Sequence, residues 1–460
     1  MLFISYFVLL FIDAMRIVIA GAGEVGTHLA KMLSNENHDI ILVDTEEDHL
    51  KPLDSSLDVL TYVGSATSVN LLRDILQKKT DLFIAVTHWE DTNITSSILA
   101  KKFGAVKTIA RIDNLDYLEH STLEFFKSLG IDSLIYPELI AAREVLGLLH
   151  ETGTTEFMEF CGGKLAMYVQ KLDENAPILN KTLEEMSIDH STDKFRAVAI
   201  KRNDKTIIPK GQDRFFLDDT VFVISTNEGI AEMMARSGKK SFEAKRIMIL
   251  GGSRIGKHVA LYMQKSCEVK LIDSDPAKCQ ALSEILDDTL IINGDCRDVE
   301  VLEQEGISEM DAFVAVTGNS ETNILSCLLA KKFGVKKTIA EVENMEYISL
   351  AENTGIDTII NKKISAASRI FRHTSNQNVT QVKYMTGTDA EVIEFNVPEN
   401  ARITKGTLRG LDFPRDAIVG GGTRDGVPYI ATGDTIIKVN DKVVVFTLPS
   451  AYEKISKFFT

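Results

Sequence analysis

A glycine-rich segment near the beginning of the chain has the residue types and spacing of a phosphate-binding loop. It reads Gly21-Ala22-Gly23-Glu24-Val25-Gly26, follows a β-branched run at residues 16–20 and precedes a helical pattern. In such a loop the first glycine permits a tight turn, the second lets the backbone approach a pyrophosphate, and the third brings the helix close to the sheet. The free N–H groups at the helix start then attract the phosphates.

An acidic residue stands where a ribose would lie. Asp44 closes the second predicted strand, 18 residues after Gly26. Its carboxylate would accept hydrogen bonds from the ribose hydroxyls and repel a 2′-phosphate, so the pattern favours NAD(H) over NADP(H). The alternative interpretation is a structural glycine turn in an α/β fold that binds no ligand.

The loop and its flanking elements occur a second time. Residues 16–26 (RIVIAGAGEVG) return as residues 246–256 (RIMILGGSRIG), a shift of 230 positions. The second loop therefore reads Gly251-Gly252-Ser253-Arg254-Ile255-Gly256, and Asp273 closes the strand that follows it. A repeat of this kind predicts a second nucleotide site.

The second loop departs from the first at two positions. The Cβ atom of Ser253 crowds the phosphate approach, although its hydroxyl can donate a hydrogen bond. Arg254 can pair with phosphate oxygens, whereas Glu24 at the same position of the first loop would repel a terminal phosphate. We therefore expect a dinucleotide, NAD or NADH, at the first site and ATP or ADP at the second. The alternative is a degenerate second site that stays empty.

Other residues are predicted to line the same crevices, at the carboxyl ends of the strands. Thr87 and Thr317 follow the fourth strand of each copy, and Arg111 and Glu341 end the fifth. Arg111 could reach a phosphate and Glu341 could not, which again separates the two sites. Arg111 could instead be an exposed strand-end charge with an acidic partner.

Signals for catalysis are poor. The nine histidines form no HExxH motif, and the sequence contains no GxSxG elbow or P-loop and no Cys/His set at metal spacing. We therefore expect neither an enzyme nor a metal site. The rival interpretation is an NAD-dependent oxidoreductase. The five cysteines include no CxxC pair and indicate reduced thiols in a cytoplasm.

The elements that must position these residues form a duplicated plan. Residues 98–118 match residues 328–348 at 12 of 21 positions, at the same shift of 230. The first part of each copy alternates β-branched runs with helical patterns, which is typical of a parallel sheet with crossover helices. The predicted fold class is therefore α/β, with two Rossmann-like, doubly wound parallel-sheet domains, each followed by a small α+β module. The expected Rossmann domains span residues 15–140 and 245–365, and the small modules span 155–236 and 380–460.

Composition narrows the class of partner. The 460 residues carry a net charge of −15, which argues against nucleic acid or anionic lipid as a partner. Residues 1–14 are an apolar extension, shorter than the roughly 20 residues of a bilayer span. Because the first strand begins beside Met15, we interpret the extension as upstream of the true start; the alternative is a hydrophobic anchor.

The duplicated glycine loops, the repeated AVT and KKFG segments and the small trailing modules together resemble the TrkA family, the peripheral cytoplasmic subunits of Trk-type potassium uptake systems. That family is built from two tandem RCK units (regulator of K⁺ conductance), each an RCK-N and an RCK-C domain. The resemblance implies NAD(H) or adenine nucleotides in the RCK-N domains and a homo-oligomeric ring of RCK domains. It also implies an integral-membrane potassium transporter partner of the TrkH kind, on the inner face of the plasma membrane.

Overall fold

The computed structural model describes residues 15–460 except 35–37, 188–193, 204, 239–241, 353, 372, 374–377, 386–387 and 389. The apolar extension at residues 1–14 therefore lies outside the described residues. The chain divides into two compact units. The first contains the chain up to Pro137 together with Arg369–Ser375, and the second contains Glu138–Ser368 and Asn376–Thr460.

The first unit is built on a six-stranded parallel sheet. Its order is β3-β2-β1-β4-β5-β6, the strand order of a Rossmann fold. The strands are β1 (Arg16–Ala20), β2 (Asp39–Asp44), β3 (Leu60–Val63), β4 (Leu82–Ala85), β5 (Lys107–Arg111) and β6 (Ser133–Ile135). Continuous apolar runs form β1 and β4 because both faces of a parallel sheet are covered.

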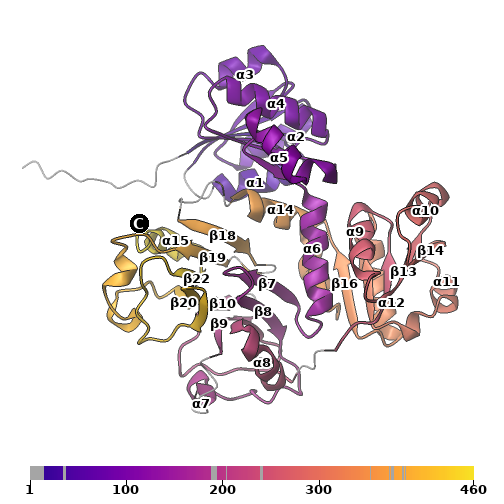
Figure 1. Ribbon diagram of the computed structural model, residues 1–460, viewed down its shortest axis with the longest axis vertical. Coiled ribbons are helices and arrows are strands. Elements are labelled where there is room, and N and C mark those ends of the chain that lie inside the picture. The colour runs from indigo at the N-terminus through magenta and orange to yellow at the C-terminus, as the bar shows by residue number, and fades with distance from the viewer. Residues whose placement is uncertain are drawn as a thin grey trace, which may run out of the picture. The chain divides into compact units, whose positions relative to one another are not determined.

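Helices cover this sheet (Figure 1). They are α1 (Glu24–Ser34), α2 (Glu47–Ser56), α3 (Val69–Ile75), α4 (Glu90–Lys102) and α5 (His120–Ser128), with the 3₁₀ helix η1 at Leu115–Leu118. On one face Leu72 and Ile75 of α3 and Ala100 of α4 pack against Val18 and Phe83. The helix starts and the strand ends meet at the carboxyl edge, where a parallel sheet binds ligands.

The second unit repeats this sheet, in the order β14-β13-β12-β15-β16-β17. Its strands are β12 (Arg246–Leu250), β13 (Glu268–Asp273), β14 (Thr289–Asn293), β15 (Ala312–Ala315), β16 (Lys337–Glu341) and β17 (Thr358–Ile360). Its helices are α9 (Arg254–Met263), α10 (Pro276–Ser283), α11 (Val299–Gln304), α12 (Ser320–Lys332), α13 (Met345–Glu352) and α14 (Lys362–Phe371), with η4 at Ile307–Glu309.

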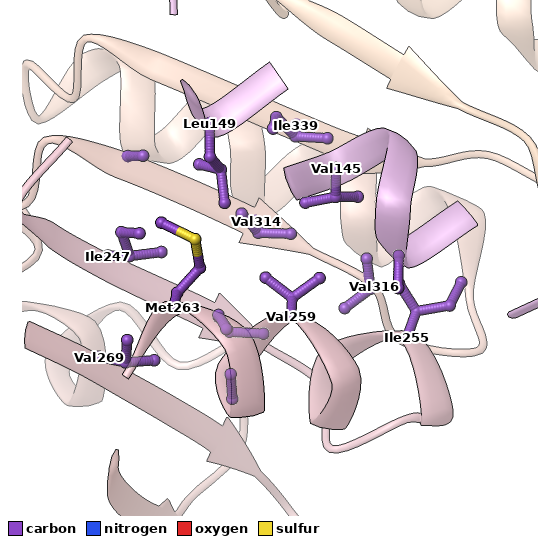
Figure 2. Close-up of a cluster of buried hydrophobic side chains, with 14 of the residues drawn as sticks. Val145, Leu149, Ile247, Ile255, Val259, Met263, Val269, Val314, Val316 and Ile339 are labelled. Carbon is purple, nitrogen blue, oxygen red and sulfur yellow. The ribbon is translucent and has the colours of Figure 1, made fainter. Parts of the chain in front are cut away.

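Helix α6 (Pro137–His150) follows the last strand of the first sheet but packs against the second sheet. Figure 2 shows Val145 and Leu149 of α6 over Val314 and Ile339 of the sheet, beside Val259 of α9. In the opposite direction, α14 follows the second sheet, and its end from Arg369 belongs to the first unit. Helix α6 therefore belongs to the unit opposite the sheet that it follows, and so do the last residues of α14; we call this arrangement the helix exchange.

Two five-stranded antiparallel sheets complete the second unit. One contains β7 (Glu156–Phe160), β8 (Leu165–Lys171), β9 (Phe195–Arg202), β10 (Lys205–Ile207) and β11 (Thr220–Thr226). The other contains β18 (Val379–Tyr384), β19 (Glu391–Asn396), β20 (Ala417–Arg424), β21 (Val427–Ile430) and β22 (Lys442–Thr447). Short helices flank the sheets: α7 (Leu183–Ser187), η3 (Asn227–Gly229), α8 (Ile230–Arg236), η5 (Arg402–Lys405), η6 (Leu408–Gly410), η7 (Pro449–Ala451) and α15 (Tyr452–Ser456).

The two antiparallel sheets share one core. Phe222 of the first sheet and Phe446 of the second lie with ring centroids 5.5 Å apart, within a cluster that includes Met167 and Val392. The predicted α/β class, with two Rossmann-like domains and two small α+β modules, is confirmed. In the described part of the chain, no helix is both long and apolar enough to span a bilayer.

Candidate nucleotide-binding sites

The first glycine loop makes a close turn between β1 and α1. The amide of Gly21 donates to the carbonyl of Val43 at 2.8 Å, and the φ angle of Gly21 is +108°, which favours glycine. A Cβ atom at Gly26 would lie 1.8 Å from the carbonyl oxygen of Gly21. Gly26 is therefore required for the close approach of α1 to the sheet.

Gly23 differs from its two neighbouring glycines. A Cβ atom at Gly23 would meet no atom of the chain within 4 Å. The space in front of the helix start is open, and Gly23 and Glu24 are exposed at its edge. Val25 instead points into the protein and is 8% exposed, so it could contact a ligand through its backbone only.

Asp44 ties the loop to the next strand. One carboxylate oxygen accepts from the amide of Ala22 at 2.6 Å, and the other accepts from the amide of Glu46 at 2.9 Å. The Nδ1 atom of His49 lies 3.4 Å from the second oxygen. Because both oxygens accept from backbone N–H groups, the site requires a carboxylate, and its remaining lone pairs are available to ribose hydroxyls.

Thr87 belongs to a buried polar link across the carboxyl edge. The Oδ1 atom of Asn93 accepts from the amide of Thr87 at 2.8 Å and from its hydroxyl at 2.7 Å. The Nδ2 atom of Asn93 donates to the carbonyls of Thr87 and Arg111, each at 3.1 Å. The guanidinium of Arg111 lies 3.6 Å from the carboxylate of Asp113. The structure therefore brings Thr87 and Arg111 to one edge.

The second loop has the same backbone and a different cap. The amide of Gly251 donates to the carbonyl of Ile272 at 2.9 Å, and a Cβ atom at Gly256 would lie 2.1 Å from the oxygen of Gly251. The Ser253 hydroxyl oxygen accepts from the amide of Gly256 at 3.3 Å and caps α9. A hydroxyl that accepts one hydrogen bond can still donate its own proton, so Ser253 could also donate to an anion. Ile255 is buried in the core.

Asp273 repeats the role of Asp44 with an added cation. It accepts from the amide of Gly252 at 2.7 Å and from the amide of Asp275 at 2.9 Å, and the ammonium of Lys278 lies 3.0 Å away. Burial opposes ionisation of Asp273, but the amides of Asp275 and Gly252 and the Lys278 ammonium lower its pKa below the ordinary value. Asp273 is therefore held as a carboxylate.

The cationic residue of the second loop faces an acid on the exchanged helix. The guanidinium of Arg254 lies 3.9 Å from the carboxylate of Glu138, at the start of α6. The side chain of Arg254 is half exposed, whereas Glu138 is buried. A phosphate at the start of α9 would therefore meet Arg254 together with this carboxylate.

Glu341 is buried where Arg111 stands in the first copy. It lies 3.3 Å from the ammonium of Lys362, which also contacts Glu343. Burial raises the pKa of Glu341 to about 7, although the positive charge of Lys362 opposes the shift. Thr317 repeats the buried link, with its hydroxyl donating to Asn323 at 2.6 Å.

Sequence reasoning missed several residues of these crevices. Asn93 and Asn323 organise both edges, and the repeated TNI triplets at residues 92–94 and 322–324 are the signal that could have identified them. Lys278 and Lys362 were also missed, because each has a different residue type at the matching position of the first copy. Among the described residues, no group of three or more His, Cys, Asp or Glu side chains could hold a metal ion.

The fold and these two edges define a class of protein: a tandem pair of Rossmann domains with nucleotide-type loops, each followed by a small antiparallel module. The TrkA-N domain model matches residues 17–137 and 247–362, and the TrkA-C domain model matches residues 169–238 and 392–460. The chain belongs to the TrkA family of Trk system potassium uptake proteins. The resemblance seen in the sequence is thereby confirmed.

Curated relatives match over nearly the whole chain. "Trk system potassium uptake protein TrkA homolog 1" of Methanosarcina mazei is 32% identical over 454 residues, covering 97% of this chain and 100% of that protein. The TrkA homolog of Archaeoglobus fulgidus is 33% identical over 446 residues, with coverage of 97% and 100%. The TrkA protein of Halomonas elongata is 29% identical over 438 residues, with coverage of 94% and 96%.

Solved structures with the same fold include two of GsuK. The GsuK RCK domain has a TM-score of 0.61 at 17% identity and covers 98% of this chain and 96% of its own. The GsuK channel bound to NAD also has a TM-score of 0.61, at 16% identity, with coverage of 98% and 80%. At these identities the likeness concerns the fold alone.

Proposed function

We propose that this protein is a peripheral, cytoplasmic, nucleotide-binding regulatory subunit of a Trk-type potassium uptake system. It gates an integral-membrane potassium transporter subunit of the TrkH kind and performs no bond chemistry. The names of the relatives support a role in potassium transport. The duplicated domain plan supports assembly into a homo-oligomeric ring on the inner face of the plasma membrane.

One observation carries the nucleotide part of the proposal: at both carboxyl edges a helix start lies beside an aspartate whose carboxylate accepts from an amide of the glycine loop. At the first site the chain itself leaves space beside Gly23, so the glycine serves the close approach of a pyrophosphate. Asp44 receives the ribose hydroxyls, and the ligand is NAD or NADH. The titles of the fold neighbours, which name NAD and ADP, are consistent with this class of ligand.

The second site takes ATP or ADP in this proposal. Ser253 caps the helix and narrows the approach, while Arg254 supplies a cation for the outer phosphate. The proposed binding residues of the two sites are the six residues of each loop, Asp44 and Asp273, Thr87 and Thr317, and Arg111 and Glu341. Of these, Glu341 acts through Lys362, because its own carboxylate is buried against that ammonium.

Control of the transporter requires no covalent step. A nucleotide shifts an equilibrium between two conformations only by its differential affinity for them. Helix α6 follows β6 of the first sheet and packs on the second sheet. A conformational change at the second site can therefore reach the segment that connects the first sheet to α6. This route needs no catalytic residue, which is why we favour a regulator over an NAD-dependent oxidoreductase.

The test uses the full-length chain, because α6 and the end of α14 each belong to the unit opposite the sheet that they follow. The protein is expressed with a Trk-type membrane subunit, solubilised, and recovered through a tag on that subunit. We expect co-purification, and we expect NADH or ATP to change potassium flux in reconstituted vesicles. Flux that ignores both nucleotides would contradict the regulatory proposal, and NADH oxidation with a metabolite would favour the enzyme.

A further inference from the structure

The segments that follow the ribose-binding aspartates differ strongly in charge between the two copies. Residues 44–49 read DTEEDH and contain four carboxylates, whereas residues 273–278 read DSDPAK and contain two carboxylates and one lysine. The segments occupy the same place, after β2 and β13, and lead into α2 and α10. The ribose side of the second crevice is therefore the less negative one by three charges, counting His49 as neutral.

Lys278 is built into this side of the second crevice. Its ammonium lies 3.0 Å from Asp273, and its side chain is 44% exposed. Its stem runs beside the loop, since a Cβ atom at Gly252 would be 3.2 Å from Lys278 Cδ. The matching residue of the first copy is His49, 3.4 Å from Asp44. The nearby Glu47 and Asp48 are exposed, with Lys51 as their neighbour.

We propose that Lys278 makes the second site accept adenine nucleotides that carry a phosphate on the ribose, at the 2′ or 3′ position, which the first site excludes. This inference rests on the proposed nucleotide binding at the second site. A ribose phosphate beside Asp273 would meet the half-exposed ammonium of Lys278, which already neutralises the carboxylate. The ammonium and the phosphate would form a charge-assisted hydrogen bond. Beside Asp44 the same phosphate would meet a cluster of carboxylates.

The experiment compares AMP with adenosine 2′,5′-bisphosphate and adenosine 3′,5′-bisphosphate by titration calorimetry. The full-length chain carries Gly23→Val, which fills the open space of the first loop and leaves the second site to be measured. We expect one bisphosphate to bind at least as tightly as AMP, and the two isomers identify the position. Replacing Lys278 with the residue of the first copy, Lys278→His, should lower the ratio of bisphosphate to AMP affinity about two- to fivefold, as for one partly exposed ion pair.

The reciprocal chain carries Ser253→Val, so that only the first site binds. There the bisphosphates should bind about tenfold more weakly than AMP, and His49→Lys should reduce that difference. If the Gly23→Val chain binds AMP but both bisphosphates bind tenfold more weakly, the inference is overturned and nucleotide binding stands. If it binds none of the three although thermal unfolding shows that it is folded at the temperature of the titration, nucleotide binding at the second site is overturned too.

Discussion

Gly26 and Gly23 of the first loop form a matched pair for mutagenesis, because a side chain would clash with the protein at one position and not at the other. Gly26 is required by the chain, since its Cβ atom would lie 1.8 Å from the backbone oxygen of Gly21. Gly23 is not required by the chain, since its Cβ atom would meet nothing within 4 Å. The substitutions Gly26→Ala and Gly23→Val therefore separate folding from ligand binding within one motif.

The magnitudes follow from these distances. Gly26→Ala requires α1 to move away from β1 by more than an ångström against backbone, so the free energy of unfolding should fall by about 3 kcal/mol, the upper end of overpacking costs. Gly23→Val places a poor residue before α1 and should cost about 1 kcal/mol or less. Its branched side chain would occupy the space proposed for the pyrophosphate, and NADH affinity should fall at least about 100-fold, or roughly 2.8 kcal/mol.

Thermal unfolding and calorimetric titration with NADH measure the two effects on the same samples. Gly256→Ala is the parallel variant, because its Cβ atom would lie 2.1 Å from Gly251, and it should resemble Gly26→Ala in stability. A folded Gly23→Val protein that binds NADH as the unmodified chain does would refute the assigned phosphate position. A Gly26→Ala protein with unchanged stability would refute the packing argument.

Three further predictions concern single carboxylates. Asp44→Ala removes the acceptor of two amides, which is also the acceptor proposed for the ribose, so NADH affinity should fall ten- to 100-fold and stability by about 1–3 kcal/mol; unchanged affinity in calorimetry would count against the site. Glu341 has a pKa of about 7 in the folded protein, so its ionisation should lower the free energy of unfolding by up to roughly 3 kcal/mol as the pH rises from about 4.5 to 7. Glu341→Gln lacks this loss, so its melting temperature relative to that of the unmodified protein should rise across the same range rather than stay constant. Lys383→Met leaves the partly buried Glu144 without its cationic partner at 2.6 Å and should cost up to about 3 kcal/mol, while the double variant with Glu144→Leu recovers most of that; equal losses would contradict the pairing.

The sheets and loops could be predicted from the sequence because their signals are local. A short apolar, β-branched run such as residues 16–20 predicts a buried strand from its own composition. The glycine spacing of residues 21–26 predicts the turn that follows. Because residues 16–26 return as residues 246–256, the same inferences apply to the second copy.

The partners of helices and charges could not be predicted, because they depend on distant parts of the chain. The apolar positions of α6, such as Val145 and Leu149, indicate one buried face and not which sheet covers it. Likewise Arg254 has the residue type of a phosphate ligand, but its position 3.9 Å from Glu138 is set by the helix exchange.

Helix α6, which follows the first sheet and packs on the second, also carries an ion pair that is largely removed from solvent. Glu144 of α6 bonds Lys383 of β18 and the hydroxyl of Ser365 on α14, each at 2.6 Å. A buried pair of this kind contributes little net stability, but breaking it is expensive, so it fixes which groups stay together. If nucleotide binding at the second site moves α6 itself, β18 must move with the helix or the contact must break. Either outcome would carry a change at the second site into the antiparallel module, which is the coupling that the proposed regulatory role requires.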